Sequence, residues 1–193
     1  MEILIVVFSY LVGSIPTGVI VGKLMGIDVR SAGSGNIGAT NVARVLGKGK
    51  GALTLLADAA KGYLPVFIAR QLGVDSNTEV VVGAAAFLGH LYPIYLKFRG
   101  GKGVATALGA LLLLAPLAIL ILLAVFAAAF LTSRIVSLGS IAAAAALPMA
   151  LWLLSYPPQV IVLGAFLGAM VILRHRANIR RLFAGTEPRF GSR

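Results

Sequence analysis

The sequence predicts an all-α, polytopic integral membrane protein that forms a single domain over residues 1–193. The first observation is composition, because 59% of the 193 residues are hydrophobic and only 12% are charged. The second is a series of apolar stretches close to the ~20 residues that a helix needs to cross a bilayer. The third is that the basic residues gather in a few segments between these stretches.

Outside the central interval 104–131, five stretches are expected to span the membrane: residues 3–22, 51–71, 79–96, 136–154 and 159–173. The first is interpreted as a retained span rather than a cleaved signal peptide, because it lacks a basic leading region and a small-residue cleavage pattern. Its second half contains Ser14, Pro16 and Thr17, so we expect a kink there.

The interval 104–131 is either one tilted span or two short helices broken before Pro116, since proline lacks an N–H and disfavours helix in the residue before it. The positive-inside rule places Arg134 and the basic C-terminal segment in the cytoplasm. If the N-terminus is outside, Lys102 is also cytoplasmic, so an even number of crossings separates it from Arg134. We therefore expect two helices, near 103–114 and 116–131. This gives seven transmembrane segments with a cytoplasmic C-terminus, and six segments are the alternative.

The net charge of +11 lies mostly on the expected cytoplasmic side, because only Lys61 and Arg70 of the seventeen Lys and Arg residues fall elsewhere. In a soluble protein this charge would suggest nucleic acid, but here it must face lipid head groups or anionic substrates. No nucleic-acid partner is therefore expected. The absence of cysteine excludes a thiol nucleophile and a thioester intermediate. No cluster of metal ligands is evident, so we expect no metal and no cofactor.

The segment 31–44 combines glycines, short polar side chains and an arginine between two apolar spans. Glycines let backbone amides converge on an anion, and a guanidinium matches phosphate geometry. The alternative is a flexible connector beneath lipid head groups. We favour an anion site with these candidate residues: Gly33, Ser34, Gly35, Asn36, Thr40, Asn41 and Arg44.

A second candidate is the Gly-rich turn Gly100, Gly101, Lys102 and Gly103, which directly precedes an expected helix. Free amides at a helix start, together with a lysine, favour phosphate. The spacing is not that of a nucleotide P-loop, and a simple helix cap explains the turn equally well.

The third candidate lies in the basic segment after the last span. If that helix continues past residue 173, His175 and Asn178 would share one face. A positive-inside stop sequence is the alternative, although it explains the neighbouring arginines and not the histidine or the asparagine.

Asp58 and Lys61 lie three residues apart within a predicted span, where a structural ion pair is favoured over a functional role. Ser140, near Arg134, either lines a cytoplasmic cavity or bonds a backbone carbonyl. His90 lacks the aspartate five residues later that His-x4-Asp acyltransferases use, so we expect a hydrogen-bonded helix residue.

Three segments resemble the motifs of the bacterial acyl-phosphate:glycerol-3-phosphate acyltransferases, the PlsY family. They are residues 33–44, residues 89–93 with 100–106, and residues 174–179, and the resemblance extends from Gly13 to Glu187. It implies a seven-helix membrane enzyme that moves a fatty acyl group from acyl phosphate to the sn-1 hydroxyl of glycerol 3-phosphate. Lysophosphatidic acid and inorganic phosphate would be the products, in the first step of phospholipid synthesis at the bacterial inner membrane.

The resemblance also implies roles for individual residues. Ser34, Arg44, Lys102, His175 and Asn178 would be the most sensitive positions. Thr40, Asn41, Ser140 and the glycines would bind substrate, and Glu187 would be structural. Two other classes fit the residues less well: a carrier would need midplane polar groups and internal repeats, and a lipid-binding scaffold would not need the Ser, Asn and His set. Membrane lipid is an expected contact, and no obligate protein partner is expected.

Overall fold

The computed structural model describes residues 2–191, and in this range the chain forms ten α-helices and one 3-10 helix, without strands. The predicted all-α class is therefore confirmed. Five helical stretches are long and apolar enough to cross a membrane, and a bent pair near the C-terminus would make a sixth. The chain divides between Leu114 and Ala115 into two compact units, which are described separately. Residues 1 and 192–193, at the ends of the predicted single domain, lie outside the described residues.

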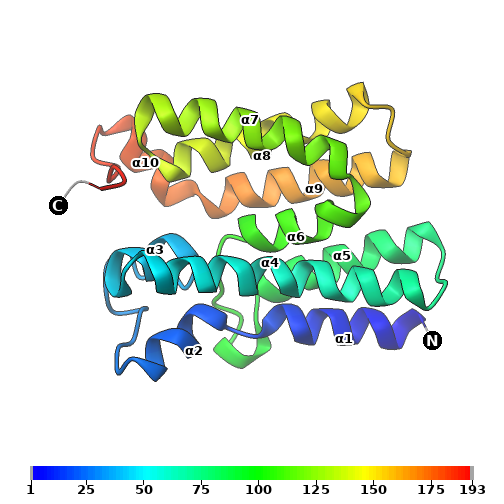
Figure 1. Ribbon diagram of the computed structural model, residues 1–193, viewed down its shortest axis with the longest axis horizontal. Coiled ribbons are helices and arrows are strands. Elements are labelled where there is room, and N and C mark those ends of the chain that lie inside the picture. The colour runs from blue at the N-terminus through cyan, green and yellow to red at the C-terminus, as the bar shows by residue number, and fades with distance from the viewer. Residues whose placement is uncertain (1, 192–193) are drawn as a thin grey trace. The chain divides into compact units, whose positions relative to one another are not determined.

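The first unit contains α1 (Glu2–Ser14), α2 (Thr17–Leu24), α3 (Ala39–Leu46), α4 (Lys48–Gln71), α5 (Ser76–Leu91), η1 (Ile94–Leu96) and α6 (Val104–Leu114). Figure 1 shows α1 and α4 running alongside each other. Helix α1 packs on α5, and α4 packs on α3, α5 and α6. Helix α4 is thus the centre of this unit.

The contact between α4 and α6 depends on glycine. A Cβ built on Gly62 would lie 2.1 Å from the carbonyl oxygen of Thr106, and one on Gly109 would lie 1.9 Å from that of Ala59. Each helix therefore presents a glycine where the backbone of the other approaches. Small residues at such positions let membrane helices pack closely, where van der Waals contact replaces the hydrophobic effect as the attraction.

The first predicted span is broken where the kink was expected. Helix α1 ends at Ser14 and α2 begins at Thr17, with Pro16 between them. The following connector, residues 23–50, contains α3, and α4 begins at Lys48. Helix α3 carries the apolar residues Val42, Val45 and Leu46. One of them, Val42, is fully buried in a small core that it forms with Val19, Val29 and Ile37.

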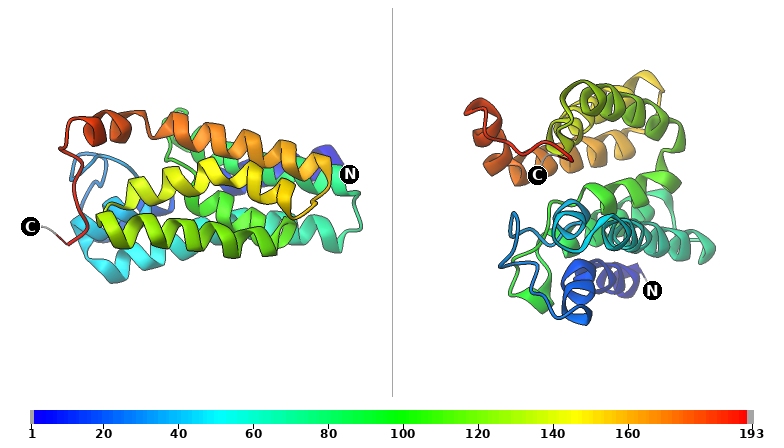
Figure 2. Two further views of the ribbon diagram at one scale, coloured as in Figure 1. Left: turned by 90° about the horizontal axis from the view of Figure 1, so that it is seen from above. Right: turned by 60° about the vertical axis from the view of Figure 1, so that its left-hand side comes forward.

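The second unit contains α7 (Pro116–Ser133), α8 (Val136–Leu153), α9 (Pro158–Arg174) and α10 (Arg176–Phe183). Helix α8 packs on both α7 and α9, and the three run alongside one another in Figures 1 and 2. The two-helix interpretation of 104–131 is confirmed. Helix α6 ends at Leu114, Ala115 has an extended φ of −151°, and Pro116 occupies the first turn of α7. The number of membrane crossings stays a prediction.

The last span does not continue as one helix. Helix α9 ends at Arg174, and α10 follows after a bend of 58° at His175. The condition under which His175 and Asn178 would share one face of a continuous helix is therefore not met. The His175 ring explains the break, because its Nδ1 lies 2.8 Å from the carbonyl oxygen of Val171, which also accepts the backbone N–H of His175. A side chain that competes for a helix carbonyl favours a bend at that point.

Candidate active site

The loop that carries Ser34 is built around the side chain of Asn41, on the first turn of α3. Asn41 is 2% exposed. Its Oδ1 accepts the backbone N–H of Ser34 at 2.7 Å, and its Nδ2 donates to three loop carbonyls, those of Val29, Ala32 and Asn36, at 2.8–3.1 Å. A buried amide with partners on both sides fixes the backbone at the points it bonds. Asn41 therefore sets the conformation of the loop around Ser34.

Ser34 lies between two glycines in the left-handed region, Gly33 at φ +60° and Gly35 at φ +69°. At Gly33 a side chain is excluded on a second ground, since a Cβ would lie 2.3 Å from Oδ1 of Asn41. Asn36 closes the turn by accepting the backbone N–H of Gly38 at 2.9 Å. The sequence thus dictates a tight loop that presents Ser34 at the surface.

Five of the predicted residues in this segment are exposed: Gly33, Ser34 and Gly35 on the loop, and Thr40 and Arg44 on α3. Thr40 and Arg44 are four residues apart, so they lie on one face of the helix. Among the described residues, Arg44 has no hydrogen-bond or ion-pair partner. Its guanidinium is therefore available to an anion from outside the chain.

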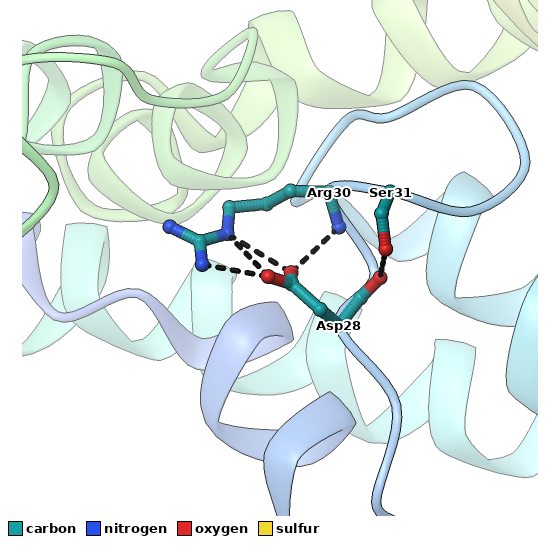
Figure 3. A network of polar contacts seen from close by, with 3 residues as sticks. All are labelled: Asp28, Arg30 and Ser31. Carbon is teal, nitrogen blue, oxygen red and sulfur yellow. Dashed lines mark hydrogen bonds and ion pairs between the residues drawn. The ribbon is translucent and has the colours of Figure 1, made fainter.

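The other arginine of this loop is already paired, as Figure 3 shows. Arg30 donates from Nε and Nη2 to the Asp28 carboxylate, at 2.9 and 2.7 Å. The Ser31 hydroxyl donates to the Asp28 carbonyl at 2.9 Å. The hydrogen bond from the Arg30 side chain lowers the pKa of Asp28 to about 2, so this carboxylate is ionised at neutral pH. Arg30 is neutralised locally, unlike Arg44.

The glycines of the second motif pack against the end of α5. The backbone N–H of Gly100 donates to the carbonyl of Leu91, and that of Gly101 donates to His90, both at 3.1 Å. Gly103 has a φ of +83°, and a Cβ there would lie 2.2 Å from the Phe87 ring. These glycines serve close packing, which fixes the start of α6 at Val104, two residues after Lys102. The expected helix after the Gly-rich turn is confirmed at Val104.

Asp58 and Lys61 form the expected ion pair, with 2.9 Å between Lys61 Nζ and Asp58 Oδ1. Their side chains are 2% and 5% exposed. His90, on the last turn of α5, lies 3.6 Å from the same carboxylate oxygen. A buried pair of this kind is tolerated only when further polar partners satisfy it.

In the second unit, Glu187 holds α8 and α10 together and is 7% exposed at its side chain. Its Oε1 accepts from the Ser137 hydroxyl and from Nδ2 of Asn178, both at 2.6 Å, and its Oε2 accepts from Nε of Arg181 at 2.7 Å. Burial acts to raise the pKa of Glu187, but these hydrogen bonds outweigh it and leave the pKa below the usual value. The carboxylate therefore orients Asn178.

The remaining predicted residues of this unit are largely buried. His175 is 2% exposed at the bend between α9 and α10. If its ring is neutral, an Nδ1–H that donates to Val171 leaves the lone pair on Nε2. The Ser140 hydroxyl donates to the carbonyl of Val136 at 3.0 Å, which matches the second of its two interpretations.

The structure therefore brings together Ser34 with Asn41, Gly101 with His90, and Asn178 with Glu187. Sequence patterns did not reveal that Asn41 is the centre of the loop, nor that Ser137 bonds Glu187 fifty residues later. In residues 2–191, no three His, Asp or Glu side chains are grouped to hold a metal ion.

Comparison with known proteins identifies a family. The family model described as glycerol-3-phosphate acyltransferase matches residues 3–185. The glycerol-3-phosphate acyltransferase of Trichlorobacter lovleyi is 52% identical over 94% of each chain. That of Geobacter sulfurreducens is 50% identical over 98% of this chain and 97% of its own.

Two crystal structures are also similar, both of PlsY (YgiH), an integral membrane glycerol 3-phosphate acyltransferase. The glycerol 3-phosphate form has a TM-score of 0.94 at 45% identity, covering 98% of this chain and 96% of the other. The lysophosphatidic acid form has a TM-score of 0.91 at 44% identity, covering 98% and 95%.

Proposed function

The chain belongs to the glycerol-3-phosphate acyltransferase family, and from this premise we propose that its acyl donor is an acyl phosphate and its acceptor is the sn-1 hydroxyl of glycerol 3-phosphate. The resemblance in the three sequence motifs is thereby confirmed at the level of the family. The products would be lysophosphatidic acid and inorganic phosphate, in the first step of phospholipid synthesis. One solved relative is named for its lysophosphatidic acid form, which supports this choice of product.

The observation that carries the proposal is the contrast between Arg44 and Arg30. Arg44 is exposed and without an internal partner among the described residues, whereas Arg30 is neutralised by Asp28. Both proposed substrates carry phosphate, so a guanidinium with no internal partner is a group that suits them. We assign Arg44 and Lys102 to the phosphates, with Thr40 and the glycines of both loops shaping the same anion sites.

An acyl phosphate is a mixed anhydride, so it is already activated for transfer. The sn-1 oxygen would attack the acyl carbon, the bond between that carbon and the phosphate oxygen would break, and the hydroxyl proton would pass to the departing phosphate. Ser34 and neighbouring backbone amides would orient the acyl carbonyl and stabilise its developing negative charge. No covalent acyl-enzyme is needed, and Ser34→Ala should retain part of the activity.

Residues of the second unit would serve the acceptor. We assign His175, Asn178 and Ser140 to glycerol 3-phosphate, with Glu187 holding Asn178 in position through the 2.6 Å hydrogen bond. Asn41 would act on the donor indirectly, because its polar atoms bond the loop that carries Ser34.

The protein is an integral membrane protein with bacterial relatives. We infer seven membrane segments in the inner membrane, an external N-terminus and an active site that faces the cytoplasm. Helix α6, with 11 residues, would be the short segment. At ~1.5 Å of rise per residue it would cover only about half of the ~30 Å hydrocarbon thickness.

The test is to incubate purified protein with palmitoyl phosphate and glycerol 3-phosphate and to measure lysophosphatidic acid and phosphate. We expect both products to require both substrates, and palmitoyl-CoA not to replace the donor. Product formation from palmitoyl-CoA at a comparable rate would refute the assignment of the donor.

Two arginine variants provide a matched pair for the phosphate assignment. Arg44→Gln should lower kcat/KM by about a hundredfold or more, in line with the loss of a charge-assisted contact to a phosphate. Arg30→Gln removes the same charge from the same connector, and we expect it to stay within about threefold of the wild type, because exposed ion pairs contribute little. Equal losses in the two variants would point to a general charge effect.

A further inference from the structure

The buried ion pair of α4 bonds both sides of the break in the first span. Lys61 Nζ donates to the carbonyl of Ile15 at 2.8 Å, on the α1 side of Pro16. On the α2 side, the Thr17 hydroxyl donates to Asp58 Oδ1. The end of a helix carries partial negative charge and its start partial positive charge, so the cation and the carboxylate each face the complementary helix end. This pairing explains why two charged side chains are tolerated although they are almost completely buried.

His90 connects this ion pair to the second motif. One side of its ring faces α4, where Nδ1 lies 3.6 Å from Asp58 Oδ1. The other side faces the Gly-rich loop, since a Cβ built on Gly101 would lie 2.1 Å from Nε2. The backbone of Gly101 also bonds the carbonyl of His90. The imidazole, 4% exposed, therefore lies between the buried carboxylate and the loop backbone.

We propose that Asp58, Lys61 and His90 are positioning residues that form a buried polar support for the loop 100–102. The support fixes the imidazole, the imidazole fixes the backbone of Gly101, and Lys102 follows directly in the chain. Gly101 has no side chain that could change its rotamer, so a displacement of the His90 ring displaces the loop backbone itself. The inference rests on the proposed function, since positioning Lys102 matters only if this loop binds a phosphate-bearing substrate.

One amide reports on the loop independently of catalysis. Gly-Gly occurs once in the sequence, at residues 100–101. In protein labelled with glycine that carries ¹³C at the carbonyl and ¹⁵N at the amide, a carbonyl-filtered amide spectrum therefore contains only the Gly101 signal. His90→Asn keeps a polar group near Asp58 but does not reach the loop. We expect it to shift this signal and to speed hydrogen exchange of the amide by about tenfold or more, as a locally loosened segment would.

Thr54→Val is the matched control. Thr54 is also buried on α4, one turn before Asp58, but its hydroxyl donates only to the carbonyl of Lys50 in its own helix. We expect the Gly101 signal to stay at its wild-type position in this variant. An unchanged Gly101 signal in His90→Asn, or an equal change in Thr54→Val, would overturn the proposal.

Two substitutions that change side-chain size link the polar support to the reaction. Gly101→Ala places a methyl group where the imidazole lies, and the backbone of Gly101 is not in the left-handed region. We expect the KM for at least one phosphate substrate to rise by about tenfold, with a smaller change in kcat, as for an interaction made equally in the ground and transition states. The shorter side chain in His90→Asn makes room for that methyl group, so the double variant His90→Asn/Gly101→Ala should have a lower KM than Gly101→Ala alone.

The outcomes separate this inference from the function it rests on. The proposal is contradicted if the double variant has a higher KM than both single variants. It is also contradicted if His90→Asn shifts the Gly101 signal but leaves the KM for both substrates unchanged. If His90→Asn does not fold, His90→Gln replaces it, and its amide, which reaches the Nε2 position, should keep the Gly101 signal near that of the wild type. If the wild-type protein makes no lysophosphatidic acid, the proposed function fails, and the Gly101 signal alone decides whether the loop is supported.

Discussion

Replacement of Asn41 by alanine is the most informative perturbation of the first unit. The side chain supplies one acceptor to Ser34 and two N–H groups that are shared among three loop carbonyls. Asn41→Ala removes all of these bonds but leaves the φ and ψ preferences of the loop glycines unchanged. The expected result is a folded protein whose loop 25–38 opens more often.

The magnitude follows from the number of bonds. One accepted and two donated hydrogen bonds, each with a net value of about 1 kcal/mol, amount to about 3 kcal/mol of loop stability. Each ~1.4 kcal/mol corresponds to a factor of ten, so the upper limit is about a hundredfold in kcat/KM. Because water can enter the exposed loop and replace some of these bonds, we expect a loss of about ten- to a hundredfold.

Two assays separate loop opening from loss of the whole fold. Steady-state turnover gives kcat/KM, and limited trypsin digestion after Arg30 reports on exposure of the loop, since proteolysis requires local opening. Asn77→Ala is the control, because Asn77 is exposed and its side chain has no hydrogen bond to the described residues. Activity of Asn41→Ala within about threefold of the control, or unchanged cleavage after Arg30, would refute the role given to this amide.

Three further predictions concern packing, pH and topology. Gly62→Ala should lower Tm, because its Cβ would lie 2.1 Å from a carbonyl oxygen of α6 and overpacking costs about 1–3 kcal/mol. Gly49→Ala is the control and should leave Tm unchanged, because a Cβ there would have no atom within 4 Å. The pKa of Glu187 is lowered by folding, so its carboxylate stabilises the protein at neutral pH and this contribution is lost as the pH falls through the folded pKa. Glu187→Gln should therefore lower Tm at neutral pH and by progressively less on acidification, and a constant difference would contradict this. Because the chain has no cysteine, an impermeant maleimide applied to spheroplasts should label Asn77→Cys but not Lys23→Cys, and the reverse would invert the topology.

Features set by short-range chemistry were predictable from the sequence. The break before Pro116 followed from a missing N–H, and the pairing of Asp58 with Lys61 followed from their spacing on a helix. The Gly-rich turn before α6 was predicted for the same kind of reason. In each case the cause and the effect lie within one helical turn.

Features that depend on distant partners were not predictable. The polar groups of Asn41 point to a loop whose path is fixed by Val29 and Val42 in a shared core, and no periodicity in the sequence reveals that core. The bend at His175 depends on which carbonyl its ring selects, and Ser137 meets Glu187 only because the C-terminal segment folds back. The phosphate-binding roles were suggested by the motifs, but the distinction between Arg44 and Arg30 required the structure.

Direct transfer between the two substrates, without an acyl-enzyme, is tested most directly by a burst experiment. Palmitoyl phosphate is mixed with a comparable amount of enzyme in the absence of glycerol 3-phosphate, and phosphate is followed from the first milliseconds. Direct transfer predicts no burst and rapid phosphate release only after the acceptor is added. A burst of about one phosphate per enzyme, as covalent catalysis produces, would contradict the account.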